Sequence, residues 1–139
     1  MIAEKLVEAV SSVLADRPEV LSAYLFGSQA EGRAHRESDV DVAVLLNRRA
    51  HPDRRSRFAV RLRIATALAG ALGRPVDVVV LNDAPPGLAR HVVTTGLRVS
   101  CADPEADHAL VRDAQLRAAD LEPFLRRTRR LKLDAIARR

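Results

Sequence analysis

Three short, largely apolar runs most constrain how this chain can fold. They span residues 21–26, 38–46 and 76–81, and turn-forming residues follow the first and third of them. Runs of this length and composition are typical of buried strands. In the second run Val40, Val42, Val44 and Leu46 are alternate residues, so they would occupy one face of the strand. None of the runs approaches the roughly 20 residues of a membrane span. The pattern therefore predicts a sheet, in a protein that is not embedded in a membrane.

Helical patterns separate these runs. Apolar residues at helical spacing predict a first helix over residues 2–14, which ends before Pro18 because proline disfavours helical geometry in the residue before it. A long helix opens at Pro52-Asp53 and closes at Gly73 and Pro75. We expect its inward face to consist of Phe58, Leu62, Ala65, Ala69 and Leu72.

The last third of the chain is mostly helical in character. We expect a short helix over residues 88–95, a short strand over 97–101, and helices from Pro104 onward with an interruption at Pro123. Strands separated by helices predict an α/β fold of the α+β type, with a small mixed sheet flanked by helices. The 139 residues would form a single domain, with a core at about 18–101 and a C-terminal helical segment at about 103–137.

The composition limits which classes of site, compartment and partner this domain can have. Cys101 is the only cysteine, which excludes an internal disulfide and a multi-cysteine zinc site. The N-terminal residues mix charged and apolar side chains without the apolar core of a signal peptide, so we expect a cytoplasmic protein. The formal charge is +5, but only four residues are aromatic, too few for the base stacking of single-strand binders. We therefore expect no direct nucleic-acid binding, whereas an acidic protein partner fits the charge.

Three aspartates carry the chemical signal of the sequence. Asp39 and Asp41 are two positions apart in a predicted strand, so their carboxylates point to the same side about 6.5 Å apart. Asp77 stands alone among valines in the third apolar run and would join them if the two strands are neighbours. Oxygen ligands without nearby histidine or cysteine favour Mg²⁺ or Mn²⁺. The alternative is structural: Asp39 caps a turn, Asp41 faces solvent and Asp77 pairs with an arginine.

Gly27 and Ser28 follow the first apolar run and suit the binding of phosphate. Glycine lets the backbone approach an anion, and serine offers both its N–H and its hydroxyl. The segment from Gly27 is not a P-loop, because Arg33 and Ala34 stand where the motif has lysine and a metal-binding hydroxyl. The four histidines show no metal-ligand spacing.

The full pattern resembles the nucleotidyltransferases of the DNA polymerase β superfamily. Their signature is Gly-Ser, ten residues, then Asp-x-Asp, and it stands here as Gly27-Ser28 followed by Asp39-Val40-Asp41, with Asp77 in the place of the third acid. The likeness covers most of residues 20–125. In its size and in its C-terminal segment, the chain is similar to the minimal nucleotidyltransferases (MNT), in particular the antitoxins of HEPN ribonuclease toxins. The resemblance implies a polymerase β-like core with C-terminal helices.

This resemblance also implies a mechanism. Asp39, Asp41 and Asp77 would be catalytic and hold Mg²⁺ or Mn²⁺, Gly27 and Ser28 would bind the β- and γ-phosphates of ATP, and Asp77 would help deprotonate the acceptor. AMP would pass from ATP to a tyrosine hydroxyl of a HEPN-type toxin, with which the chain would form a hetero-oligomer. Many relatives carry arginine at the positions of Gln29 and Glu31, and this chain has neither.

Two alternatives differ in function class. The chain could neutralise a toxin by binding alone, or it could modify a small molecule such as an aminoglycoside, although little chain follows residue 101 to bind one. A partner would contact the helices after residue 103 through an apolar stripe. The competing interpretation is that this stripe packs on the sheet. Its members are Leu110, Ala114, Leu121 and Leu125.

Overall fold

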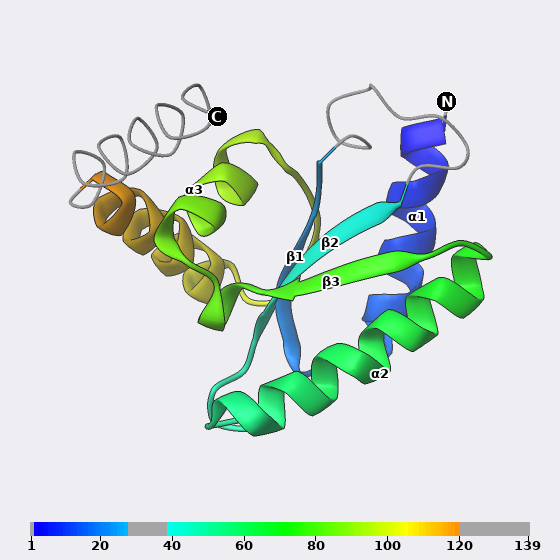
Figure 1. Ribbon diagram of the computed structural model, residues 1–139, viewed down its shortest axis with the longest axis horizontal. Coiled ribbons are helices and arrows are strands. Elements are labelled where there is room, and N and C mark those ends of the chain that lie inside the picture. Colours follow the sequence, from blue (N-terminus) through cyan, green and yellow to red (C-terminus); the bar gives the residue numbers. More distant parts are fainter. Residues whose placement is uncertain (1, 28–38, 120–139) are drawn as a thin grey trace, which may run out of the picture.

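Four strands form one mixed sheet in the order β3-β2-β1-β4 (Figure 1). The structure is a computed structural model that describes residues 2–27 and 39–119. The strand β1 pairs antiparallel with both β2 and β4, whereas β2 and β3 run parallel. The predicted α/β class with a small mixed sheet is confirmed. The strands are β1 (Val20–Phe26), β2 (Val40–Leu46), β3 (Val76–Val80) and β4 (Leu97–Cys101).

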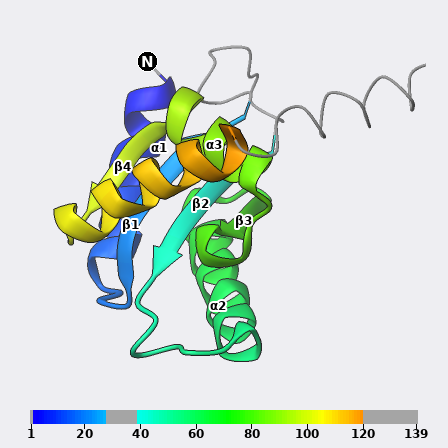
Figure 2. The same cartoon turned by 90° about the vertical axis from the view of Figure 1, so that its left-hand side faces the viewer.

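Helices cover both faces of this sheet (Figures 1 and 2). On one face lie α1 (Ile2–Ala15) and α2 (Arg54–Leu72), and on the other lie α3 (Pro86–Thr95) and a helix that begins at residue 104 and is described to residue 119. A short 3-10 turn, η1 (Leu81–Asp83), joins β3 to α3. No helix among the described residues is long and apolar enough to cross a membrane.

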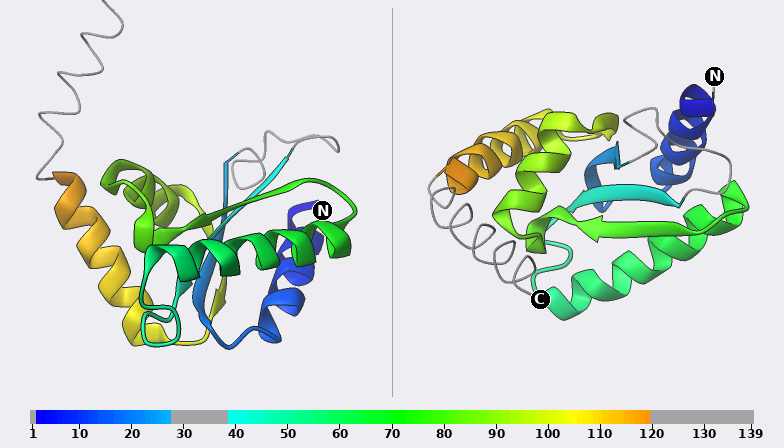
Figure 3. Two further views of the ribbon diagram at one scale, coloured as in Figure 1. Left: turned by 60° about the horizontal axis from the view of Figure 1, so that its bottom comes forward. Right: turned by 45° about the horizontal axis from the view of Figure 1, so that its top comes forward.

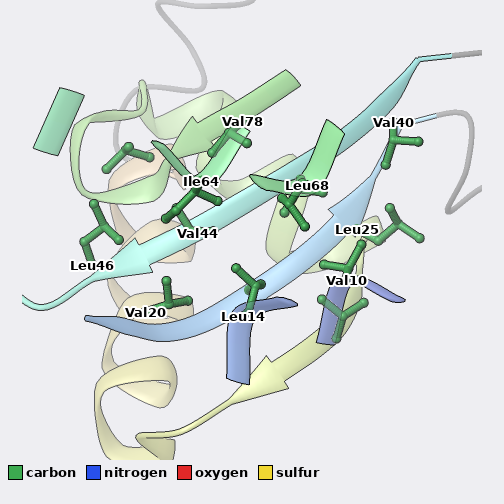
Figure 4. Close-up of a cluster of buried hydrophobic side chains, with 14 of the residues drawn as sticks. Val10, Leu14, Val20, Leu25, Val40, Val44, Leu46, Ile64, Leu68 and Val78 are labelled. Carbon is green, nitrogen blue, oxygen red and sulfur yellow. The ribbon is translucent and has the colours of Figure 1, made fainter. Parts of the chain in front are cut away.

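The larger apolar core fills the space between the sheet and the helices α1 and α2. Alternate residues of β2 point into it, as their spacing predicted. Figure 4 shows these side chains meeting Val10 and Leu14 of α1 and Ile64 and Leu68 of α2. A second cluster lies on the opposite face, where Tyr24, Phe26 and Leu45 meet α3 and the helix of residues 104–119.

The helix α2 begins and ends where its capping residues predicted. Asp53 is its N-cap and accepts a hydrogen bond from the backbone N–H of Ser56 at 2.6 Å. Gly73 closes the helix in the left-handed conformation, with a φ of 66°, and donates its N–H to the carbonyl of Ala69.

The predicted inward face of α2 is wrong in its first half. Phe58 and Leu62 are each 52% exposed, although Ala65 and Leu72 do pack on the core. The buried positions are Arg57, Val60, Ile64 and Leu68.

The observed inward face of α2 is therefore rotated about the helix axis from the predicted one, and an ion pair explains this rotation. Arg57 donates two hydrogen bonds to Asp83, at 2.9 and 2.8 Å, and a third to the carbonyl of His51. The bond from Arg57 holds the pKa of the Asp83 carboxyl below its usual value. A charged residue can be buried when it is paired in this way, so α2 presents Arg57 inward and leaves Phe58 on the surface.

The helix after residue 103 packs on the sheet in its described part. Ala114 and Ala118 are buried, and Leu110 contacts the second apolar cluster. This outcome matches the competing interpretation of the apolar stripe. Leu121, Leu125 and Pro123 lie outside the described residues.

Candidate active site

Strand register brings two of the predicted acids together. Asp41 and Asp77 are partners in the parallel pairing of β2 with β3, so their backbones lie about 4.8 Å apart. The expected adjacency of these two strands is therefore confirmed. Both residues are second in their strands, and because the strands are parallel, both lie at the same end of the sheet.

The strand β1 brings glycine to the same end. It runs antiparallel to β2, pairs Phe26 with Asp41, and ends immediately before Gly27. Asp41 alternates with the core residues Val40 and Val42, so it points to the opposite face of the sheet, the face that carries α3. We call Gly27, Asp39, Asp41 and Asp77 the acidic site.

Gly27 is held in a conformation and a space that only glycine fits. Its φ is 75°, and a Cβ at this position would lie 2.5 Å from Oδ2 of Asp41. Any side chain would therefore strike the carboxylate that the neighbouring strand presents. The backbone at the end of β1 therefore passes directly beside the carboxylate of Asp41.

The carboxylates of the acidic site repel one another. The pKa of Asp41 is raised above its usual value, first by burial and then by the negative charges of Asp77 and Asp39. Asp77 is more open, with 60% of its side chain exposed, and its Oδ1 lies 3.6 Å from Nη2 of Arg61 on α2. Asp39 is exposed and immediately precedes β2.

These residues fit a hard cation by their chemistry, although they do not enclose one. Within residues 2–27 and 39–119, no three His, Cys, Asp or Glu side chains converge closely enough to hold a metal ion. The side chain of Asp77 lies toward Arg61, and Asp39 immediately precedes β2. The donors are all carboxylate oxygens, and a divalent cation would relieve the repulsion at Asp41.

Arg61 is a neighbour of the acidic site that the sequence did not reveal. Arg61 was not singled out, because nothing in the sequence indicates that this one of the many arginines faces Asp77. Ser28, Gln29 and Glu31 lie outside the described residues. A surface groove of about 820 Å³ is lined by Leu46, Arg49 and Leu116 among others and lies at the opposite end of β2 from Asp41.

Comparison with known proteins reveals close relatives. The sequence profile of the family described as polymerase beta, nucleotidyltransferase matches residues 8–105. A curated relative, the protein adenylyltransferase MntA of Shewanella oneidensis, is 42% identical over 79 residues, which are 57% of this chain and 52% of that protein. The match thus spans about half the length of this relative.

Solved structures agree with this match. A crystal structure of a toxin–antitoxin with AMP-PNP has a TM-score of 0.67 and 28% identity, and the alignment covers 94% of this chain and 98% of that one. A crystal structure of the toxin–antitoxin MntA–HepT has a TM-score of 0.62 and 25% identity over 96% of this chain and 98% of its own. The predicted resemblance to minimal nucleotidyltransferases and their polymerase β-like fold is confirmed.

Proposed function

The chain belongs to the polymerase beta nucleotidyltransferase family, and we propose that it transfers AMP from ATP to a tyrosine hydroxyl of a HEPN-type toxin, for which it is the antitoxin. The observation that carries this proposal is the in-register pair of Asp41 and Asp77 beside Gly27. The similarity to a protein adenylyltransferase and to toxin–antitoxin complexes, one of them with AMP-PNP, supports the choice of nucleotide and partner.

The reaction we propose is an in-line displacement. The acceptor oxygen attacks the α-phosphorus of ATP and forms a new P–O bond. The bond between the α-phosphorus and the bridging oxygen breaks, and pyrophosphate leaves with the electron pair. The hydroxyl proton passes to the carboxylate of Asp77, which is exposed enough for a side chain of another protein to reach.

The remaining residues of the acidic site bind and position the nucleotide. Asp39, Asp41 and Asp77 would hold Mg²⁺ or Mn²⁺, which when bound neutralises phosphate charge. Gly27 has no side chain, so the backbone at the end of β1 can lie against Asp41, and we assign this backbone to the triphosphate side of the site. We assign to Ser28, the next residue, the donation of hydrogen bonds to the β- and γ-phosphates.

Removing one carboxylate tests the proposal. The purified chain is incubated with ATP labelled at the α-phosphate, MgCl₂ and the HEPN-type toxin, and the label on the toxin is measured. We expect Asp41→Asn to lower the transfer rate about 100- to 1,000-fold, because it removes a charged ligand while keeping the shape of the side chain. We expect EDTA to abolish transfer in the unmodified chain.

The same assay separates the alternatives. A toxin that is unlabelled but still inhibited by the chain, and by an Asp39→Ala and Asp41→Ala double variant, would indicate neutralisation by binding alone. Label on an aminoglycoside in place of the toxin would indicate a small-molecule acceptor. Either result would contradict the proposed transfer to protein.

A further inference from the structure

A second groove, of about 310 Å³, lies along the edge of the sheet beside α2. The strand β3 is the edge strand of the sheet among the described residues, and α2 runs next to it (Figure 3). Arg54, Phe58 and Arg61 line the groove from α2, and Val79 and Leu88 line it from β3 and α3. We call this the α2–β3 groove.

An exposed aromatic side chain gives the α2–β3 groove an apolar wall. Phe58 is half exposed, and Leu62, one turn further along α2, is exposed to the same extent. Two large apolar side chains on one turn of a surface helix are typical of contact surfaces, and an aromatic ring contributes much of the binding energy when a partner covers it. The rotation of α2 that buries Arg57 places Phe58 in this position.

The charge of the α2–β3 groove favours an acidic partner. Asp83 also lines it, but Arg57 already binds both carboxylate oxygens of Asp83 from behind. Arg54 reaches the same carboxylate only at 3.6 Å and is mostly exposed. The side chain of Arg54 is 79% exposed and that of Arg61, which also contacts Asp77, is 40% exposed, so carboxylates of another molecule can reach both.

One end of the α2–β3 groove adjoins the acidic site. Arg61 lies over the ring of Phe58, with its Cζ 5.9 Å from the ring centroid, and the same guanidinium is 3.6 Å from Asp77. Along β3, Asp77 precedes Val79 by two residues, a distance of about 7 Å. A segment bound in the groove thus has a neighbouring residue within reach of Asp77.

We propose that the α2–β3 groove binds the acceptor segment of the protein substrate: an acidic segment whose apolar side chain contacts Phe58, whose carboxylates meet Arg54 and Arg61, and whose hydroxyl-bearing residue reaches Asp77. This inference rests on the proposed function, because it assigns the place where that reaction's acceptor binds. In this proposal, acidic charge and one apolar side chain are the features of the acceptor segment that the groove recognises.

Two synthetic peptides serve as the probe. The first contains one tyrosine, one leucine about three residues away and flanking glutamates, and the second has lysine in place of every glutamate. Binding to the full chain is measured by fluorescence anisotropy without ATP, so that the result does not depend on catalysis. We expect the acidic peptide to bind about tenfold more tightly than its lysine counterpart.

Variants locate the binding on the surface, which is necessary because a chain of net charge +5 attracts acidic peptides everywhere. Phe58→Ala and Arg54→Ala should each weaken binding of the acidic peptide about five- to tenfold. Matched controls are Leu116→Ala and Arg112→Ala, two exposed residues of the helix of residues 104–119, which should bind like the unmodified chain. Arg61 is left intact because it also contacts Asp77.

The outcomes separate this inference from the proposed function. If the acidic peptide binds no more tightly than the lysine peptide, or if Phe58→Ala and Arg54→Ala bind like their controls, the groove assignment is overturned, even if AMP is transferred to the toxin. If binding shows the expected selectivity but neither peptide nor toxin receives AMP, the proposed function fails and the groove remains a binding site for acidic segments.

Discussion

At the scale of single residues, Gly27 shows how tightly the backbone packs against a carboxylate in the acidic site. Its backbone adopts a left-handed conformation beside a carboxylate of the adjacent strand, and there is no room for a methyl group between them. The position is therefore constrained twice, by backbone conformation and by space.

Gly27→Ala should impair both activity and stability. The added Cβ would push the Asp41 carboxylate out of place, and a displacement of about 1 Å in such a site can lower the rate about 100-fold. An alanine at positive φ should also lower the free energy of unfolding by about 1–3 kcal/mol. The two quantities are measured by AMP transfer and by urea denaturation.

Gly70 provides the matched control. It lies within α2, and a Cβ there would meet nothing within 4 Å. Gly70→Ala should leave transfer intact and raise the free energy of unfolding by about 0.5–1 kcal/mol, because alanine favours the helix. Equal losses from both substitutions would contradict the role assigned to the close contact at Gly27.

At the scale of elements, a buried polar cluster attaches the helix of residues 104–119 to the sheet. The hydroxyl of Tyr24 on β1 donates to Asp107 at 2.6 Å, and Arg98 on β4 donates to the other carboxylate oxygen at 3.0 Å. Burial, together with the bond to Asp107, raises the pKa of Tyr24. Asp107 itself is buried, and these two donors are side-chain partners of its carboxylate.

Asp107→Asn should destabilise the fold by about 2–3 kcal/mol. The amide keeps the size of the side chain but removes the charge, and its single oxygen can accept only one of the two bonds that Tyr24 and Arg98 donate to Asp107. Asp113 on the same helix forms an exposed ion pair with Arg117, so Asp113→Asn should change stability by less than about 0.5 kcal/mol. Thermal unfolding of the two variants compares them directly, and similar losses would count against the cluster as the anchor.

Some helices and strands could be predicted from the sequence, whereas contacts between them could not. The strands and the caps of α2 followed from alternation and from Asp53 and Gly73, which are local signals. The inward face of α2 could not be predicted from such local signals, because its apolar residues are spread around the helix. The contact that decides it, between Arg57 and Asp83, joins residues 26 positions apart. The sequence allowed a pairing of Asp77 with an arginine, but for the same reason it could not indicate that this arginine is Arg61.

At the scale of the whole molecule, the sheet places negative charges side by side at one end. The acids themselves could be predicted from their spacing, whereas the pairing of Asp41 with Asp77 depends on the register of β2 with β3. The raised pKa of Asp41 means that the folded chain holds this proton more tightly than the unfolded chain does. Its ionised form therefore opposes folding above the ordinary pKa of 3.8, and the penalty disappears as the pH falls through the range between that value and the raised one.

Asp41→Asn should therefore raise the melting temperature at pH 7 in a buffer with EDTA, and the gain should shrink as the pH is lowered toward 4. Adding MgCl₂ at pH 7 should raise the melting temperature of the unmodified chain, since a bound cation offsets the repulsion, and should affect the variant less. Differential scanning fluorimetry at several pH values measures both effects. A variant that is less stable than the unmodified chain at pH 7 would show that Asp41 is not under electrostatic strain.

The parallel register of β2 with β3 also has a consequence for the timing of function. Asp41 and Asp77 become neighbours only when the crossover through α2 is complete, so a nascent or half-assembled chain possesses the individual carboxylates without the pair. The AMP transfer proposed above therefore requires the completed pairing of β2 with β3, and a partly folded copy would lack the paired acids on which that proposal rests.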